Sequence, residues 1–114
     1  RLMKKVQPNR KDRVHLQKLL HSLSSIQMSP EQEVISSYNV LLEIFEAVQF
    51  KREQHVTPQK FLEQVSVRFP QISAFFSGTT ETFSEVLYGR KSLKESELLK
   101  FRRDMKHLFS FFGF

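Results

Sequence analysis

The titratable side chains of this sequence are seldom spaced so that they could form a catalytic or metal-binding site together. The four histidines are His15, His21, His55 and His107, and no two of them are four residues apart, the spacing that brings two metal ligands onto one helix face. Asp104 and His107 are three residues apart and could face the same way. Two ligands do not complete a zinc or transition-metal site, so we predict no bound metal.

Hydrolytic and group-transfer chemistry has equally little support. The carboxylate pairs stand at helix-face spacings, which solvation explains: Glu43 with Glu46, Glu81 with Glu85, Glu95 with Glu97. The chain has no cysteine and no G-x-S-x-G motif, and its glycines are isolated at positions 78, 89 and 113. Such glycines cannot form a phosphate-binding loop. We therefore predict a fragment without enzymatic activity, cofactor or small-molecule substrate.

A basic run near the C-terminus raises the possibility of nucleic-acid binding. It consists of Lys100, Arg102, Arg103 and Lys106. These residues alternate with apolar positions as a solvated helix face would, acidic neighbours dilute their charge, and no recognition motif accompanies them. We expect a solvated face and no nucleic-acid partner. A stand-alone helical nucleic-acid-binding domain is kept as the alternative function.

The elements that must carry these residues are all helices. Apolar residues recur at helical spacing throughout, which predicts helices over residues 10–26, 30–50, 58–68 and 71–87 and a last helix opened by Ser92. Ser29 with Gln32 and Ser92 with Glu95 have the spacing of capping boxes, and Thr57 precedes Pro58 as a cap precedes a first turn. Gly89 suits a helix C-terminus, and Ser77-Gly78 suits a kink. The sequence predicts an all-α, compact bundle of about five helices.

Phenylalanine supplies most of the aromatic content, with twelve residues. Most stand at core spacing, so packing explains them better than a lipid or cofactor pocket. Phe111 and Phe114 lie beyond the apolar stripe of the last helix. They either dock on the bundle or offer an apolar contact to a partner, and we favour docking.

The net charge of +6 is concentrated at one end of the chain. Residues 1–18 contain seven basic residues and one acid, whereas residues 19–114 contain eleven of each. We divide the chain into a basic juxtamembrane leader, residues 1–13, and a helical bundle domain, residues 14–114. The leader would bind anionic lipid of the inner leaflet through its cations, since Lys and Arg cluster on the cytoplasmic side of membranes: Arg1, Lys4, Lys5, Arg10, Lys11, Arg13. A solvated tail is the alternative. No apolar run is long enough to cross a bilayer, and because residue 1 is not methionine we expect a piece of a longer protein.

Several motifs stand between residues 38 and 108: Tyr38 with LLEIF, then TPQKF, then FP, then YGRKSLKESELLKFRR. Together they resemble a bacterial domain of unknown function that forms the cytoplasmic C-terminal tail of membrane-anchored transglutaminase-like proteins. The matching positions are Tyr38, Thr57, Pro58, Phe61, Tyr88, Gly89, Ser92 and Glu95. Lys60 departs from the family pattern, which has an acid there. The resemblance covers about two-thirds of the chain and brings no catalytic residue with it.

The resemblance implies an accessory role. In such proteins the Cys-His-Asp site belongs to an extracytoplasmic domain, and a last membrane helix leads into the tail. We therefore expect a non-catalytic cytoplasmic C-terminal accessory or interaction domain of a bacterial multi-pass membrane protein, with a protein partner or self-association as its mode of action. The parent protein would be a transglutaminase-like acyltransferase or protease.

Overall fold

The computed structural model describes residues 7–89 and 92–114. Within these ranges the chain forms five α-helices and one short 3₁₀ helix, and no described residue forms a strand. The helices are α1 (Arg10–Ser25), α2 (Pro30–Ala47), α3 (Pro58–Arg68), η1 (Pro70–Ile72), α4 (Ser73–Leu87) and α5 (Glu95–Phe111). The radius of gyration is 13.9 Å, close to the value of about 13 Å expected for a compact domain of this length. The predicted all-α bundle of about five helices is confirmed.

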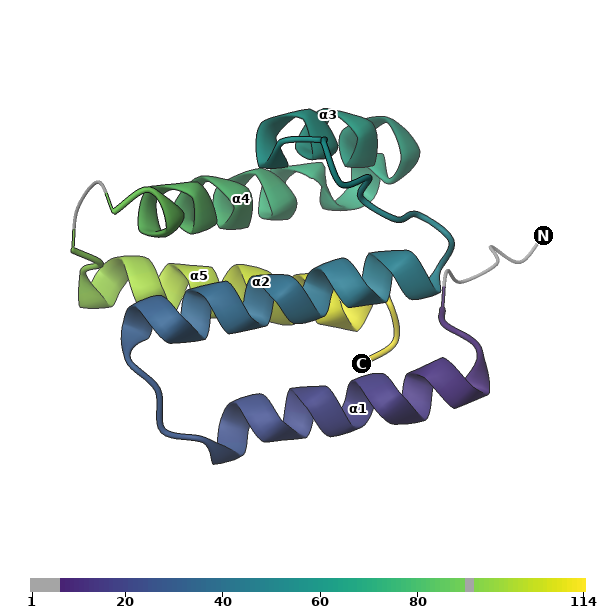
Figure 1. Cartoon of the computed structure of the whole chain (residues 1–114), viewed down its shortest axis with the longest axis horizontal. Coiled ribbons are helices and arrows are strands. Elements are labelled where there is room, and N and C mark those ends of the chain that lie inside the picture. The colour runs from purple at the N-terminus through teal and green to yellow at the C-terminus, as the bar shows by residue number, and fades with distance from the viewer. Residues whose placement is uncertain (1–6, 90–91) are drawn as a thin grey trace.

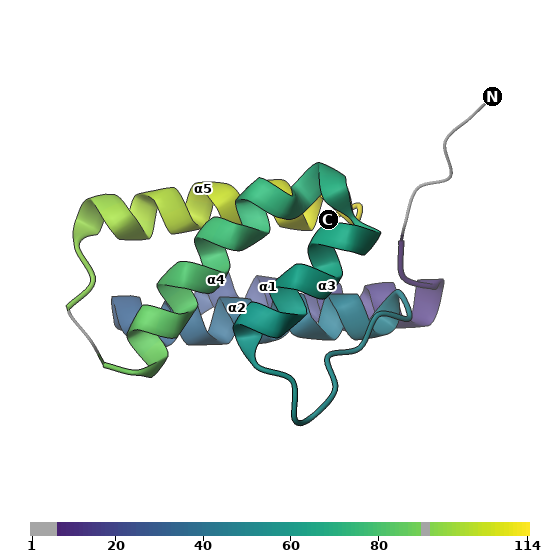
Figure 2. The same ribbon diagram turned by 90° about the horizontal axis from the view of Figure 1, so that it is seen from above.

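The helices are stacked around α2, which packs against α1, α4 and α5. In Figure 1, α3 and α4 lie above α2 and α5, and α1 lies below them on the opposite side of α2. Seen from above in Figure 2, α4 runs diagonally over the space between α5 and the α1–α2 pair, and α3 lies beside α4. The central position of α2 follows from its wide apolar surface, and seven of its residues are buried. Four helices therefore share one core, and α1 is attached to that unit mainly through α2.

Helix starts follow the local signals in three cases. The Asn9 side chain accepts a hydrogen bond from the Asp12 backbone N–H at 2.9 Å. Ser29 and Gln32 form the predicted reciprocal capping box, with both bonds at 3.2 Å. Thr57 accepts from the backbone N–H of Lys60 at 3.2 Å, and Pro58 takes the first helical position as predicted. These bonds pair backbone N–H groups that would otherwise lack a partner in the first turn.

The predicted capping box of Ser92 with Glu95 is wrong. Helix α5 begins two residues later, at Glu95, and its cap position is Lys94. The Lys94 backbone N–H donates to the Glu97 carboxylate at 2.9 Å, so Glu97 supplies the acceptor expected from Glu95. Just before this start, the Leu93 backbone N–H donates to Glu31 of α2 at 3.3 Å. This bond ties the segment before α5 to α2.

Two helices end in the same backbone motif. Helix α2 stops at Ala47, three residues before the predicted end, because Gln49 adopts a left-handed conformation with φ of 67°. The Phe50 N–H then donates to the Phe45 carbonyl at 2.8 Å, the six-residue bond of a Schellman motif. At the end of α5, Phe114 donates to Phe109 in the same way at 2.9 Å. This turn folds the C-terminal Phe back toward its helix, which confirms the predicted docking.

Gly78 does not divide α4. The helix is continuous from Ser73 to Leu87, and Gly78 lies where α4 approaches α5. A Cβ atom at this position would lie 2.9 Å from Asp104 Oδ2 and 3.2 Å from Lys100 Nζ. Gly78 therefore does not split the helix, and its absent side chain makes room for the Lys100–Asp104 ion pair, whose N–O distance is 2.8 Å.

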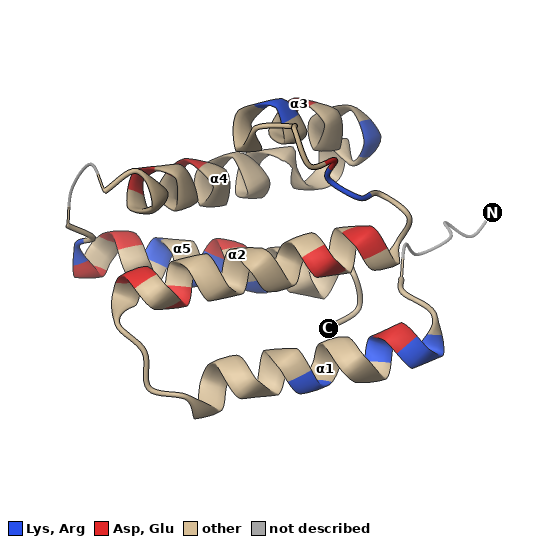
Figure 3. Cartoon of the chain, in the orientation of Figure 1, with Lys and Arg blue, Asp and Glu red and all other residues tan. Residues whose placement is uncertain are grey.

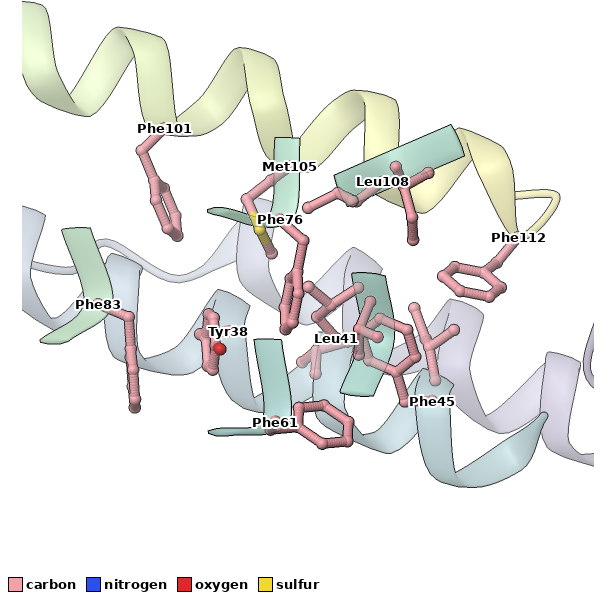
Figure 4. Close-up of a cluster of buried hydrophobic side chains, with 14 of the residues drawn as sticks. Tyr38, Leu41, Phe45, Phe61, Phe76, Phe83, Phe101, Met105, Leu108 and Phe112 are labelled. Atoms are coloured by element: carbon pink, nitrogen blue, oxygen red, sulfur yellow. The ribbon is translucent and has the colours of Figure 1, made fainter. Parts of the chain in front are cut away.

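Phe45 lies at the centre of the core. Five aromatic rings have their centroids within 5.2–6.3 Å of its ring, and they come from the loop after α2 and from the other packed helices: Phe50, Phe61, Phe69, Phe76 and Phe112. Several meet it edge to face, an arrangement that the quadrupoles of aromatic rings favour. Figure 4 shows Phe45 of α2 pointing into the space where α3, α4 and α5 converge. One side chain thus contacts every helix of the shared core.

Tyr38 occupies the same core one and a half to two turns earlier on α2. Its ring is fully buried and stacks on Phe83 with a centroid distance of 4.0 Å (Figure 4). Its hydroxyl is 2.8 Å from Thr80 Oγ1, so α2 and α4 share a buried hydrogen bond. Burial raises the pKa of Tyr38 to about 12. The tyrosine of the family motif is therefore a core residue.

Truncating Phe45 should remove more stability than truncating any peripheral phenylalanine. We expect Phe45→Ala to lower the free energy of unfolding by roughly 3–5 kcal/mol, the range for buried Phe to Ala, because the cavity is lined by five aromatic rings. Phe75→Ala is the control, since Phe75 is partly exposed and stacks on His107. Urea unfolding followed by circular dichroism gives both values. Equal losses would contradict the central role of Phe45.

Tyr38 should also make the domain sensitive to alkaline pH. Its folded pKa of about 12 lies above its ordinary value, so the folded state keeps the proton after the unfolded chain has lost it. The contribution of Tyr38 to stability is intact below pH 10 and should be lost as the pH rises from about 10 to about 12. An absorbance titration of tyrosinate should show a late step that is missing in Tyr38→Phe. A late step retained in that variant would contradict the assignment.

Candidate functional site

A groove between α1 and α5 is the main apolar concavity among the described residues. It has a volume of about 410 Å³, within the range of ligand-binding clefts. Phe101 and Met105 of α5, both almost fully buried, form its floor together with Ser37 of α2. The other residues that line it form its walls and rim: Leu20, Leu23, Ser24, Glu33, Arg102, Lys106, Phe109, Ser110 and Phe114.

The groove exists because the apolar stripe of α1 is only partly covered. Leu16 is the one residue of α1 that is fully buried, and it packs into the main core. Leu20 and Leu23, one and two turns later, are only partly buried and face the groove. On the opposite wall, Phe109 and Phe114 are also only partly buried. Both walls are therefore apolar side chains that still contact solvent.

The rim of the groove carries two cations, of which one is paired with an acid and the other has no acidic partner in the described ranges. Arg102 donates two hydrogen bonds of 2.7 Å to the Glu33 carboxylate, and these bonds raise the pKa of the Arg102 guanidinium. The pair is exposed, so it orients the side chains more than it stabilises the fold. Lys106, one turn further along α5, has no acidic partner within the described ranges. An anionic group in the groove would therefore meet Lys106 first.

Arg13 holds the C-terminal turn, whose last residue, Phe114, lines the groove. It donates a hydrogen bond from Nη2 to the Gly113 carbonyl oxygen, and its guanidinium lies 5.0 Å from the centre of the Phe114 ring. Gly113 has a φ of +90°, and a Cβ there would lie 2.6 Å from Gln7 Nε2 and 2.9 Å from Arg13 Nη1. Only glycine fits this turn without displacing the side chains around it.

The cations predicted to bind a membrane surface have different environments. Arg10 and Lys11 are exposed in the first turn of α1, where Figure 3 shows basic residues on both sides of Asp12. Arg13, assigned with them from the sequence, is partly buried against the C-terminal turn. Its Nη2 donates to Gly113 and its guanidinium faces the Phe114 ring, while its buried Nη1 has no hydrogen-bond partner among the described residues. Arg1, Lys4 and Lys5 lie outside the described residues.

The residues that carry the family resemblance do not gather into a site. Tyr38, Phe61 and Pro58 are buried, and Thr57 caps α3. Tyr88 is the exposed cap residue of α4, and Gly89 follows it with a φ of +62°, as predicted for a helix end. Ser92 and Glu95 are exposed at the start of α5 and do not form the predicted box. These residues build the helix ends and the core.

The candidate residues for metal or nucleic-acid chemistry are also dispersed. Asp104, expected on a solvated face, is buried between α4 and α5 and pairs with Lys100, while the exposed His107 stacks on Phe75 at 4.5 Å. In the described part of the chain no three His, Asp or Glu residues are close enough to hold a metal ion. Of the four basic residues on α5, Lys100 and Arg102 are paired with acids. The groove itself was not predicted from the sequence.

No family model, curated protein or solved structure matches this chain in the comparisons with known proteins. No described helix is both long enough and apolar enough to span a membrane.

Replacing Gly113 should destabilise the C-terminal turn for two reasons: its backbone has a positive φ, and there is no room for a side chain. Gly89 has a similar positive φ of +62°, but a Cβ there would meet nothing within 4 Å. Gly89→Ala should therefore cost about 1–2 kcal/mol from the left-handed conformation alone. We expect Gly113→Ala to cost more than Gly89→Ala, because it also collides with Gln7 and Arg13. Thermal unfolding of both variants checks this order, and a smaller cost for Gly113→Ala would contradict the Arg13 contact.

Proposed function

We propose that this chain is a non-catalytic accessory domain that binds an anionic membrane surface through its basic N-terminal segment and presents its helical surface to a protein partner. In this proposal it is the cytoplasmic C-terminal domain of a bacterial multi-pass membrane protein of the transglutaminase-like type. The chemical reaction would belong to another domain of the parent protein, because the motifs that carry the resemblance bring no catalytic residue to this chain.

The placement of charge is the observation that carries the proposal. The whole net charge of +6 lies in residues 1–18, and the remaining residues are balanced. Basic residues beside an anionic bilayer contribute about 1 kcal/mol of attraction each. A segment with this charge would hold the domain at the surface and leave the neutral bundle free to bind something else.

The charges at the start of α1 also support contact between this end of the domain and an anionic surface. Arg10 and Lys11 are exposed at the N-terminus of α1, where the helix dipole is positive. Cations at this end are unfavourable for an isolated helix, and only Asp12 offsets them within the first turn. Phosphate groups of a bilayer would remove this repulsion and interact with the helix end at the same time. Both effects favour contact between the start of α1 and an anionic surface.

Binding to lipid vesicles tests the proposal. The full chain should bind vesicles that contain about a third phosphatidylglycerol and should not bind neutral phosphatidylcholine vesicles. It should dissociate from the anionic vesicles as the salt concentration rises. The variant Lys4→Gln/Lys5→Gln/Arg10→Gln/Lys11→Gln should lower the partition coefficient by about three orders of magnitude, since each of the four cations contributes about 1 kcal/mol. Arg13 is left unchanged because it holds the C-terminal turn. Co-sedimentation gives the partition coefficients.

A matched variant separates placement from net charge. Lys51→Gln/Lys60→Gln/Lys94→Gln/Arg103→Gln removes the same four charges from exposed positions outside the N-terminal segment. It should bind vesicles almost as well as the unmodified chain. Equal weakening of the two variants would reject the proposal. Salt-dependent binding of duplex DNA that exceeds vesicle binding would favour the nucleic-acid alternative.

A further inference from the structure

The groove between α1 and α5 is exposed apolar surface that the domain does not cover itself. Its floor is buried, but Leu20, Leu23, Phe109 and Phe114 on its two walls are each partly open to solvent. These residues lie along the two helices that flank α2, with the C-terminus between them in Figure 1. Contiguous apolar surface with a polar rim is typical of binding sites.

We propose that this groove binds one amphipathic helix of a partner protein, and that a carboxylate on that helix pairs with Lys106. This proposal names the contact that the accessory domain makes with its protein partner. It therefore rests on the interaction part of the proposed function and does not depend on attachment to a membrane.

The length of the groove fits a helix. The residues of α5 that line it run from Phe101 to Ser110, which at about 1.5 Å per residue corresponds to about 13–14 Å of helix. A bound helix that contributes apolar anchors at positions i, i+4 and i+7 needs about 10–11 Å between the first and the last. The groove therefore accommodates three anchors along its length. Its floor of Phe101 and Met105 offers adaptable apolar contacts for them.

The charge on the rim argues against a second copy of the chain in the groove. Two copies placed groove to groove would bring their Lys106 residues together, and like charges at an interface are unfavourable.

The polar groups on the rim match the sides of an amphipathic helix. Ser24 of α1 and Ser110 of α5 stand on opposite walls, and both are exposed. A helix has polar side chains on both sides of its apolar stripe, so it could use both walls. A single-chain amphiphile has one polar end and would use only one of these groups. Lys106 supplies the charge preference because Arg102 is already paired with Glu33.

Selection from a displayed library of helical peptides tests the proposal. The peptides are about 18 residues long, with fixed leucines at i, i+4 and i+7 in the middle of the peptide and with the other positions randomised. Selection uses the full chain and counter-selection uses Ser110→Trp, which places an indole in the groove from an exposed position. We expect the enriched peptides to carry Asp or Glu at one side of the leucine stripe.

Matched variants locate the binding. Peptides should bind Ser96→Trp like the unmodified chain, because Ser96 is exposed on α5 outside the groove, and should bind Ser110→Trp about tenfold more weakly or worse. Lys106→Glu should weaken binding to a similar degree, and Arg103→Glu, which makes the same change of net charge outside the groove, should not. The sequence has no cysteine, so Ser110→Cys carries a single photo-crosslinker that should attach to the peptide.

Three results would overturn the proposal. One is a selection that yields no peptide preferring the unmodified chain over Ser110→Trp. Another is equal weakening by Lys106→Glu and Arg103→Glu, which would show attraction to net charge alone. The third is dodecanoate shifting the amide resonances of the groove when no peptide does, which would assign it to anionic amphiphiles. All of these measurements omit vesicles, so failed vesicle binding with intact peptide binding rejects the membrane attachment only.

Discussion

The structure depends on the packing of aromatic rings around Phe45. This residue contacts rings from α3, α4 and α5 and from the loop that follows its own helix, so four helices are held by one cluster. Close packing of this kind leaves little freedom in the spacing of the helices involved. Helix α1 is outside the cluster and contributes only Leu16 to the fully buried core. The division into a fixed four-helix unit and an added helix explains why the apolar groove lies beside α1.

Local chemistry made much of the fold predictable from sequence. Ser29 with Gln32 and Thr57 with Pro58 act within one helical turn, so their caps depend on little beyond neighbouring residues. Gly89 likewise marks a helix end because it tolerates a positive φ. The end of α2 was less visible, since Gln49 takes the left-handed position that glycine usually occupies. There the contact of Phe45 with Phe50 helps to set the turn, and sequence periodicity alone extends the helix too far.

Features that depend on distant residues could not be predicted in the same way. Ser92 and Glu95 have the spacing of a capping box, but the helix begins two residues later, after a segment that is bonded through Leu93 to Glu31, 62 residues away in sequence. Gly78 looks like a weak point in a helix, yet it makes room for a side chain of α5. Arg13 resembles the other basic residues near the N-terminus until its contact with Gly113, 100 residues later, is known. The groove belongs to this class, because its walls come from opposite ends of the chain.

The polar contacts of α1 make its two halves different. Arg13 joins the C-terminal turn, and His15 lies 3.8 Å from Glu43 of α2, so both contacts are in the N-terminal half of the helix. The C-terminal half, which lines the groove, is held within the described structure through partly buried leucines. Apolar contacts are not directional, so they permit small changes of spacing that a hydrogen bond would resist. The same helix thus has a basic, polar-anchored start beside the C-terminus and an adjustable end that forms one wall of the groove. The proposed function would use both properties, the basic start at an anionic surface and the apolar end toward a partner, and both lie within the sixteen residues of α1.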